Sequence, residues 1–194
     1  MVFSKREMDT IKESINIAMG KTANALSEIF NDLVLIDVPE IIVERVERAK
    51  EFLKNKYKRF HSIHQSFLGG VEGKIYVLFP ESSLNNLVKI LSGEEKIDKD
   101  FLDDILLELG NILTNNIIGA IGEFLNVRIE YTLPEGGEVN FSELQAGDDY
   151  YVVIINSILK LKSKNIKINF LIVFTIKAFD KFKSLFSEVI NNES

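Results

Sequence analysis

The chain has 194 residues, of which 46% are hydrophobic and 27% are charged, so it can bury a sizeable core as one large domain or two small ones. Its net charge of -6 argues against sequence-independent binding to nucleic acid, which needs a basic surface. The sequence has no cysteine, which excludes disulfides and thiolate chemistry, and it shows no signal core and no apolar run of bilayer length. We therefore expect a soluble, cytoplasmic protein.

The first half of the chain alternates between helical and strand patterns. It predicts, in order, a long amphipathic helix at 5–30, a Val- and Ile-rich strand at 34–46, a charged, helix-compatible stretch at 45–59, a hairpin at 60–80 and a short helix at 82–91. Pro39 lies in the middle of the strand and has no amide proton, so we expect an edge strand or a bend there. Gly69 and Gly70 are expected to form the turn of the hairpin.

The second half repeats this order. It predicts a long helix at 101–125, a strand at 127–133, a glycine-containing loop, a hairpin at 150–176 and a closing helix at 178–190. The hairpin turn falls near 162–165, where Asn165 corresponds to Gly70, and both residue types tolerate a positive φ. The two halves together predict an α/β fold of the α+β type, with one mostly antiparallel central sheet and two long helices packed on it.

An internal repeat relates the two halves. Four residues recur with a constant offset of 95 positions: Asp9, Glu13, Asn16 and Pro39 correspond to Asp104, Glu108, Asn111 and Pro134. Internal repeats organise whole folds, so the offset predicts a duplicated unit with a pseudo-twofold axis. We expect a single domain, 1–194, made of two pseudo-repeats at 1–93 and 97–194, with a polar connector at 93–96 that is too short to act as a flexible linker.

Each long helix carries the sequence Asp-x-x-x-Glu-x-x-Asn. We call these the first box (Asp9, Glu13 and Asn16) and the second box (Asp104, Glu108 and Asn111). Positions i, i+4 and i+7 of a helix fall within roughly a 60° arc, so each box forms one polar stripe. The apolar face of each helix lies opposite its stripe, which predicts two equivalent sites exposed on the surface.

Four kinds of role fit these residue types. A stripe of Asp, Glu and Asn can be an ordinary solvated face, although three identities kept at a fixed offset favour a function. Two carboxylates per box without a histidine form a thin ligand set for a metal ion, so we expect no metal site in the chain. A carboxylate pair can act as general acid and base, but a convex helix face offers no pocket. The fourth role is a site completed by a partner protein, in which Asn holds a water and Glu pairs with a partner's Lys.

The box has a counterpart in known proteins. The string Asp-x-x-x-Glu-x-x-Asn, followed after 22 residues by Pro and present twice, resembles the signature of the CheC/CheX/FliY phosphatases of bacterial and archaeal chemotaxis. Two boxes in a chain of this length are most like CheC, because CheX has a single box and FliY carries an additional domain. The resemblance covers essentially the whole chain. One departure is Ala18, which stands where the family commonly has the first Gly of an Ile-Gly-x-Gly sequence.

The resemblance implies an enzyme of chemotaxis signalling, a CheY-phosphate phosphatase that hydrolyses the aspartyl phosphate of a response regulator. Asn16 and Asn111 would position the attacking water in the regulator's active site. Glu13 and Glu108 would pair with a Lys of the regulator and fix the docked complex.

The remaining expectations concern supporting residues and partners. Asp9 and Asp104 would support the first turn of each helix as negative charges near its N-terminus, or would contact the partner's rim. Mg²⁺ would be held by the regulator, and this chain would have no cofactor of its own. The partners implied are the phosphorylated CheY-type response regulator and, as a second partner, the receptor deamidase CheD, with no nucleic acid and no membrane insertion. Two non-enzymatic alternatives use the same fold: a scaffold resembling the middle domain of the flagellar switch protein FliM, which lacks the boxes, and a regulator that acts through CheD.

Overall fold

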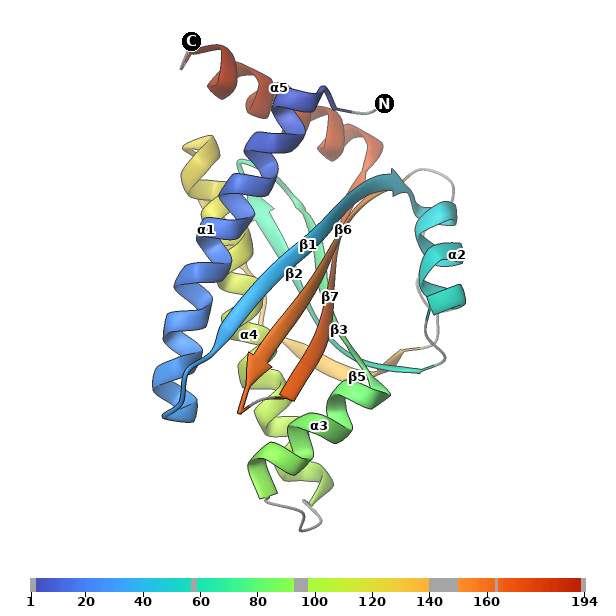
Figure 1. The fold of residues 1–194 in the computed structure, drawn as a ribbon. Coiled ribbons are helices and arrows are strands. Elements are labelled where there is room, and N and C mark those ends of the chain that lie inside the picture. The colour runs from blue at the N-terminus through green and yellow to red at the C-terminus, as the bar shows by residue number, and fades with distance from the viewer. Residues whose placement is uncertain (1–2, 57–58, 93–97, 140–149, 163, 193–194) are drawn as a thin grey trace.

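The computed structural model describes residues 3–56, 59–92, 98–139, 150–162 and 164–192. Its elements, labelled in Figure 1, are α1 (Lys5–Phe30), β1 (Leu35–Arg45), α2 (Val46–Lys56), β2 (Phe60–Gly69), β3 (Gly73–Pro80), α3 (Glu81–Ser92), α4 (Lys99–Leu125), β4 (Ile129–Tyr131), β5 (Glu135–Val139), β6 (Tyr150–Leu161), β7 (Lys164–Thr175) and α5 (Ile176–Asn192). The order of these elements matches the prediction except at β5.

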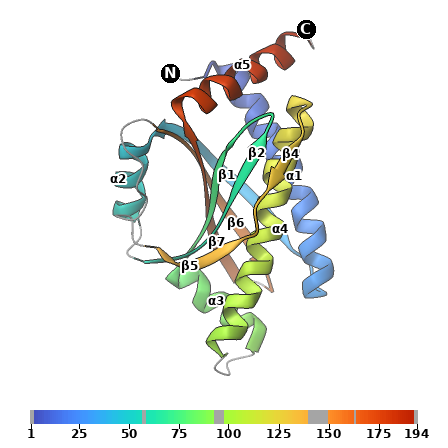
Figure 2. The same ribbon diagram turned by 180° about the vertical axis from the view of Figure 1, so that it is seen from behind.

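One seven-stranded sheet contains strands from both halves of the chain. Its order is β1-β6-β7-β3-β2, and both β4 and β5 pair with the remaining edge of β2. All of these pairs are antiparallel, and the sheet is strongly curled (Figures 1 and 2). The predicted fold class, a mostly antiparallel sheet with long helices packed on it, is confirmed.

Helices cover both faces of this sheet. α1 and α4 pack against each other on one face, where their buried side chains join those of α5 and the central strands in the main core. α2 lies on the opposite side (Figure 1), with Val46, Ala49 and Leu53 packed in a second cluster that includes Phe60 and Leu78. The charged stretch predicted to be helix-compatible is therefore a helix with one apolar stripe buried against the sheet.

The sheet order shows the pseudo-twofold axis. The axis exchanges β1 with β4 and β5, β2 with β6, and β3 with β7. After this exchange the strand order reads the same from the opposite edge of the sheet. The axis passes between β3 and β7, where Lys74 pairs with Val173 and Leu78 pairs with Asn169. These two pairs are images of each other, because 74 + 95 = 169 and 78 + 95 = 173. The predicted duplication thus extends from the boxes to the strand register.

The two long helices end in the same way. Asn31 and Asn126, which are also 95 residues apart, adopt the left-handed conformation, with φ of 48° and 52°. The N–H of Asn31 bonds to the carbonyl of Glu28, and that of Asn126 bonds to the carbonyl of Glu123. In each case the next N–H bonds to the carbonyl five residues before it, which completes a Schellman motif. Asn tolerates this conformation better than most residues other than glycine, so each asparagine fixes where its helix stops.

Each proline of the repeat interrupts an edge strand. β1 lies at the edge of the sheet, and its register against β6 shifts between Asp37 and Glu40, around Pro39. In the second half the chain around Pro134 separates β4 from β5. The expectation of an edge strand with a bend at Pro39 is confirmed, because a residue without an N–H cannot complete a central ladder.

The loop predicted after Pro134 is partly wrong, because its first residues form β5. This strand pairs with β2, with Gly136 opposite Ile63. A Cβ on Gly136 would lie 2.9 Å from Cδ1 of Ile63, so the glycine lets the strand approach closely. The pairing satisfies an edge of β2 that would otherwise be open. Residues 140–149, the rest of the predicted loop, lie outside the described residues.

Both hairpins turn at the predicted places, after β2 and after β6, but the predicted correspondence between Gly70 and Asn165 is wrong. Positive φ occurs at Gly69 (126°) and Lys162 (46°), not at Gly70 and Asn165. Asn165 lies in β7, paired with Lys160. Residues 70–72 separate β2 from β3, whereas only residues 162 and 163 separate β6 from β7. The second turn is shorter, so the 95-residue correspondence does not extend through β6.

Among the described helices, α4 is long and apolar enough by length and composition to cross a membrane. In this fold its buried residues form one continuous face along the helix: Leu106, Leu109, Gly110, Leu113, Thr114, Ile117, Ile118, Ile121, Gly122 and Leu125. The apolar members of this face belong to the main core with α1 and the sheet. Its composition is therefore that of a helix buried in a protein core.

Candidate functional site

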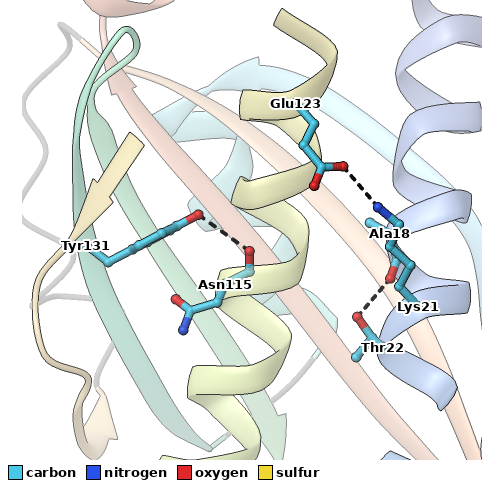
Figure 3. Close-up of polar contacts among 6 residues, drawn as sticks. All are labelled: Ala18, Lys21, Thr22, Asn115, Glu123 and Tyr131. Atoms are coloured by element: carbon cyan, nitrogen blue, oxygen red, sulfur yellow. Dashed lines mark hydrogen bonds and ion pairs between the residues drawn. The ribbon is translucent and has the colours of Figure 1, made fainter. Parts of the chain in front are cut away.

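The helices that carry the two boxes, α1 and α4, lie side by side (Figure 1). Figure 3 shows a polar contact between them, in which Nζ of Lys21 and Oε2 of Glu123 form an ion pair at 2.9 Å. Both side chains are exposed, so this pair contributes little to stability. On the inner face of α1, the hydroxyl of Thr22 donates to the carbonyl of Ala18 at 2.8 Å. Apolar packing therefore holds the two helices together, with the polar stripes outside.

The first box is fully exposed. Its helix begins with a capping box in which Oγ of Ser4 accepts from the N–H of Glu7, and the Glu7 carboxylate accepts from the N–H of Ser4. Beyond this cap, Asp9, Glu13 and Asn16 are all exposed. None of their three side chains forms a hydrogen bond or ion pair with another described residue. Their side chains are therefore free to change rotamer when a partner arrives.

The surface around Asn16 is open. Ile17 beside it is 57% exposed. A Cβ added to Gly20, one turn later, would meet no atom within 4 Å. Nothing in the described structure therefore restricts the amide of Asn16 to one orientation.

The second box is held more firmly. Asp104 and Glu108 are exposed, whereas Asn111 is half-buried. Oδ1 of Asn111 accepts a hydrogen bond from Nε2 of Gln65 at 3.2 Å and another from Nδ2 of Asn115 at 3.0 Å. The structure thus exposes all of the first stripe but only the two carboxylates of the second. The prediction of two equivalent exposed sites is wrong for Asn111, which is half-buried and bonded to its neighbours.

Gly110 explains how Asn111 comes close to the sheet. It is buried, and a Cβ there would lie 2.4 Å from Cγ2 and 2.6 Å from Cβ of Ile63. α4 therefore approaches β2 closely at this point, which brings Asn111 within reach of Gln65. The counterpart of Gly110 in α1 is Ile15 (15 + 95 = 110), a buried side chain that needs room between its helix and the sheet. The two boxes share residue types but differ in support.

Asp9 and Asp104 were predicted to support the first turn of each helix as negative charges, and this role does not fit the helix bounds. α1 begins four residues before Asp9, and α4 begins five residues before Asp104. Both carboxylates therefore lie in the second turn, where the effect of the helix dipole has largely decayed. The acidic residues of the first turns are Glu7 and Asp100. The other role, a contact with the partner's rim, stays a prediction.

The two histidines of β2 lie near carboxylates of other elements. Nε2 of His61 is 3.8 Å from Oδ1 of Asp103, and Nε2 of His64 is 3.3 Å from Oε2 of Glu135. Burial lowers the pKa of His64, with a smaller contribution from Lys74, and Glu135 opposes this shift. Within the part of the chain that the structure describes, no three His, Asp or Glu side chains gather as a metal site requires.

The residues that hold Asn111 were missed by sequence analysis. Gln65 is only 2% exposed and lies 46 positions before Asn111, on a strand that no spacing rule links to the helix. Asn115 could have been found, because it lies at i+4 on the same helix face. The hydroxyl of Tyr131 lies 3.5 Å from the carbonyl of Asn115 (Figure 3), which adds a contact from β4 to this end of the box.

Comparison with known proteins supports the resemblance. No family model matches the sequence. The chain is 22% identical over 197 residues to the CheY-P phosphatase CheC of Bacillus subtilis (strain 168), which covers 94% of this chain and 93% of that protein. FliY of Thermotoga maritima has a TM-score of 0.76 and 20% identity, covering 97% of this chain and 100% of that one.

Two further solved structures share the fold. FliM in the FliM–SpeE complex of H. pylori has a TM-score of 0.69 and 12% identity, covering 96% of this chain and 97% of that one. A chain of the CheX–CheY–BeF3–Mg²⁺ complex of Borrelia burgdorferi has a TM-score of 0.51 and 15% identity, covering 82% of this chain and 97% of that one. The predicted resemblance to the CheC/CheX/FliY proteins is confirmed, and the fold is the one these proteins and FliM share.

Proposed function

We propose that this protein is a phosphatase that hydrolyses the aspartyl phosphate of a CheY-type response regulator. The observation that carries the proposal is the duplicated stripe, in which a Glu and an Asn recur with the same spacing on two neighbouring helices, with both glutamates and Asn16 exposed and Asn111 half-buried. Such a pair acts best on a substrate that brings its own active site, as a phosphorylated protein does. The similarity to CheC, a CheY-P phosphatase, supports the reaction, and the CheX–CheY complex supports the type of partner.

In this proposal Asn16 or Asn111 enters the partner's active site and holds the attacking water. The water oxygen forms a new bond to phosphorus while the bond from phosphorus to the aspartyl oxygen breaks. The electron pair of the broken bond returns to the carboxylate, and the protons of the water leave with the phosphate or pass to solvent. Phosphoryl transfer needs little covalent chemistry from the enzyme, so positioning and charge placement supply the catalysis.

The other box residues dock the partner. Glu13 and Glu108, one turn before each Asn, would pair with a Lys of the regulator, which sets the register of the complex. Asp9 and Asp104, a further turn away, would contact its rim. Mg²⁺ would be held by the regulator and would neutralise the phosphoryl oxygens. The proposed reaction places the protein in the cytoplasm.

A non-enzymatic role is the second candidate, because FliM shares the fold over nearly the whole chain. In that role the stripes would bind a partner without hydrolysis. The presence of both Glu and Asn in two copies favours the enzyme, because binding alone does not require an amide at the same place in each helix. Binding of CheD remains a prediction from the resemblance to CheC.

The test is release of phosphate from a CheY-type receiver domain that has been phosphorylated by a small phosphodonor. A catalytic amount of this protein should accelerate release in the presence of Mg²⁺, and chelation of Mg²⁺ should stop it. Binding to the receiver without acceleration would support the scaffold role and reject the phosphatase. The absence of both binding and acceleration with a panel of receivers would reject the phosphatase and any scaffold role that acts on a receiver.

A further inference from the structure

The amide of Asn111 has an orientation that its surroundings dictate. Nε2 of Gln65 lies 3.0 Å from the backbone carbonyl of Thr132 and 3.2 Å from Oδ1 of Asn111. A backbone carbonyl can only accept, so the atom of Gln65 that faces Thr132 must be the nitrogen. The atom of Asn111 that faces this nitrogen must then be the oxygen, and the atom of Asn115 that faces the same oxygen at 3.0 Å must be its NH₂ group.

Thr132 is itself fixed. Its N–H donates to the carbonyl of Ser66 at 3.0 Å, and its hydroxyl accepts from the N–H of Ser66 at 3.0 Å. This double contact ties the segment before Pro134 to β2 and determines where the carbonyl of Thr132 points. The orientation of Asn111 thus depends on backbone geometry as well as on the side-chain amides of Gln65 and Asn115.

The two hydrogen bonds use the full acceptor capacity of the Asn111 oxygen, since an amide oxygen has two lone pairs. Nδ2 of Asn111 forms no hydrogen bond with a described residue and is not among the buried polar atoms without a partner. Because it is neither bonded nor completely buried, Nδ2 is accessible to a hydrogen-bond acceptor from solvent. The only chemistry left to this side chain is donation of a hydrogen bond.

From these contacts we infer that Gln65 and Asn115 are positioning residues for the second box and that Asn111 acts on its partner as a hydrogen-bond donor. The inference deepens the proposed function, on which it rests. The donor would hold the oxygen of the attacking water through one lone pair and leave the other lone pair for phosphorus. A pre-oriented group costs less to order in the transition state than a free one.

The first box lacks this arrangement. The sequence counterpart of Asn115 is Gly20 (20 + 95 = 115). In the sheet Gln65 pairs with Ile75, and the image of Ile75 is Phe170 (75 + 95 = 170), which pairs with Ile155, so the place of Gln65 is taken by a buried apolar side chain. Asn16 therefore has no amide neighbour to fix its oxygen, and it can present either end to a partner. The first box therefore serves as an internal control, since it has the same residue types without the neighbours that fix the asparagine.

The two boxes can be separated for the experiment. Glu13→Ala with Asn16→Ala leaves only the second box, and we call this variant the second-box protein. Glu108→Ala with Asn111→Ala leaves only the first box and gives the first-box protein. In the second-box protein, Gln65→Leu keeps the buried volume but removes the donor. One hydrogen bond corresponds to about a fivefold effect, so the turnover number for a phosphorylated CheY-type receiver should fall about fivefold with little change in the Michaelis constant. Asn115→Ala should act in the same direction.

The same Gln65→Leu change in the first-box protein distinguishes positioning from stability. A general effect on the fold would lower the turnover numbers of the first-box and second-box proteins equally, which would overturn the inference. A drop confined to the second box supports it. Asn111→Asp supplies a second test, because the carboxylate has the shape of Asn but cannot donate. It should reduce turnover of the second-box protein as far as Asn111→Ala does, and higher activity of the Asp variant would refute the donor role.

A readout without catalysis keeps the inference separate from the proposed function. In the amide NMR spectrum of the unbound protein, the side-chain NH₂ signals of Asn111 should shift and broaden on Gln65→Leu, while those of Asn16 should not. An unchanged Asn111 signal would refute the positioning role, even if phosphatase activity is present. A second-box protein that shows this NMR change but no phosphate release with any receiver would instead reject the proposed function.

Discussion

The close approach of α4 to β2 at Gly110 can be tested by adding a single methyl group. In Gly110→Ala the new Cβ would lie 2.4 Å from Cγ2 and 2.6 Å from Cβ of Ile63. The Cβ of Ile63 cannot rotate away, so the helix or the strand must move. Overpacking of this kind costs about 1–3 kcal/mol. The matched control is Gly20→Ala, where a Cβ would meet nothing within 4 Å.

Both substitutions replace a helical glycine by alanine, which by itself favours the helix by about 1 kcal/mol. Gly20→Ala should therefore raise the free energy of unfolding by about 1 kcal/mol. The free energy of unfolding of Gly110→Ala should be about 1–3 kcal/mol lower than that of Gly20→Ala. The gain in helix preference is the same in both variants, so the difference reports the overpacking. Urea unfolding followed by circular dichroism measures both values.

The packing account also predicts coupling between the two residues in contact. Ile63→Ala should destabilise the Gly110→Ala protein less than it destabilises the wild type, because the smaller side chain makes room for the new methyl group. Two results would refute the reasoning: equal stabilisation by Gly110→Ala and Gly20→Ala, or additive effects of Gly110→Ala and Ile63→Ala.

Three further predictions concern the boxes and a histidine. The second-box protein should have a kcat/KM about 2- to 12-fold above that of the first-box protein, because ordering a free side chain costs about 0.5–1.5 kcal/mol; equal values would contradict this. Glu13→Ala with Glu108→Ala should raise the Michaelis constant, and the effect should shrink as salt increases; an effect independent of salt would argue against ion pairing with the partner. Burial lowers the pKa of His64 in the folded state below 6.5, so the unfolded state binds more protons in that range and stability should fall as pH drops below about 6.5. In His64→Gln this part of the pH dependence should disappear from urea unfolding curves, and an unchanged dependence would exclude His64 as its source.

Much of the fold could be predicted because its signals are local or repeated. The long helices follow from apolar spacing, and the 95-residue offset places the second copy of each element. The same comparison would have found Asn31 and Asn126, which end α1 and α4. β5 could not be predicted, because Gly136 and Gly137 favour a loop in isolation. They lie in a strand because β2 offers an open edge, and Gly136 lets that strand approach Ile63 closely.

The residues of the two boxes could be predicted from the sequence, but the neighbours that hold Asn111 could not. The boxes are visible as a pattern, since their members lie on one helix face. The bond from Gln65 to Asn111 joins a strand to a helix, and it depends on Gly110 allowing the two to approach. No sequence spacing encodes such a contact. The difference between the two boxes therefore became apparent only from the packing of α4 on β2.

The most direct test of the central claim is the rate of phosphate release from a phosphorylated CheY-type receiver by the variant Asn16→Ala with Asn111→Ala. If these amides hold the attacking water, they act mainly in the transition state. The variant should then bind the receiver as the wild type does, while release falls to the receiver's own spontaneous rate. Wild-type turnover by the folded variant would contradict the claim and would leave binding as the function of the two boxes.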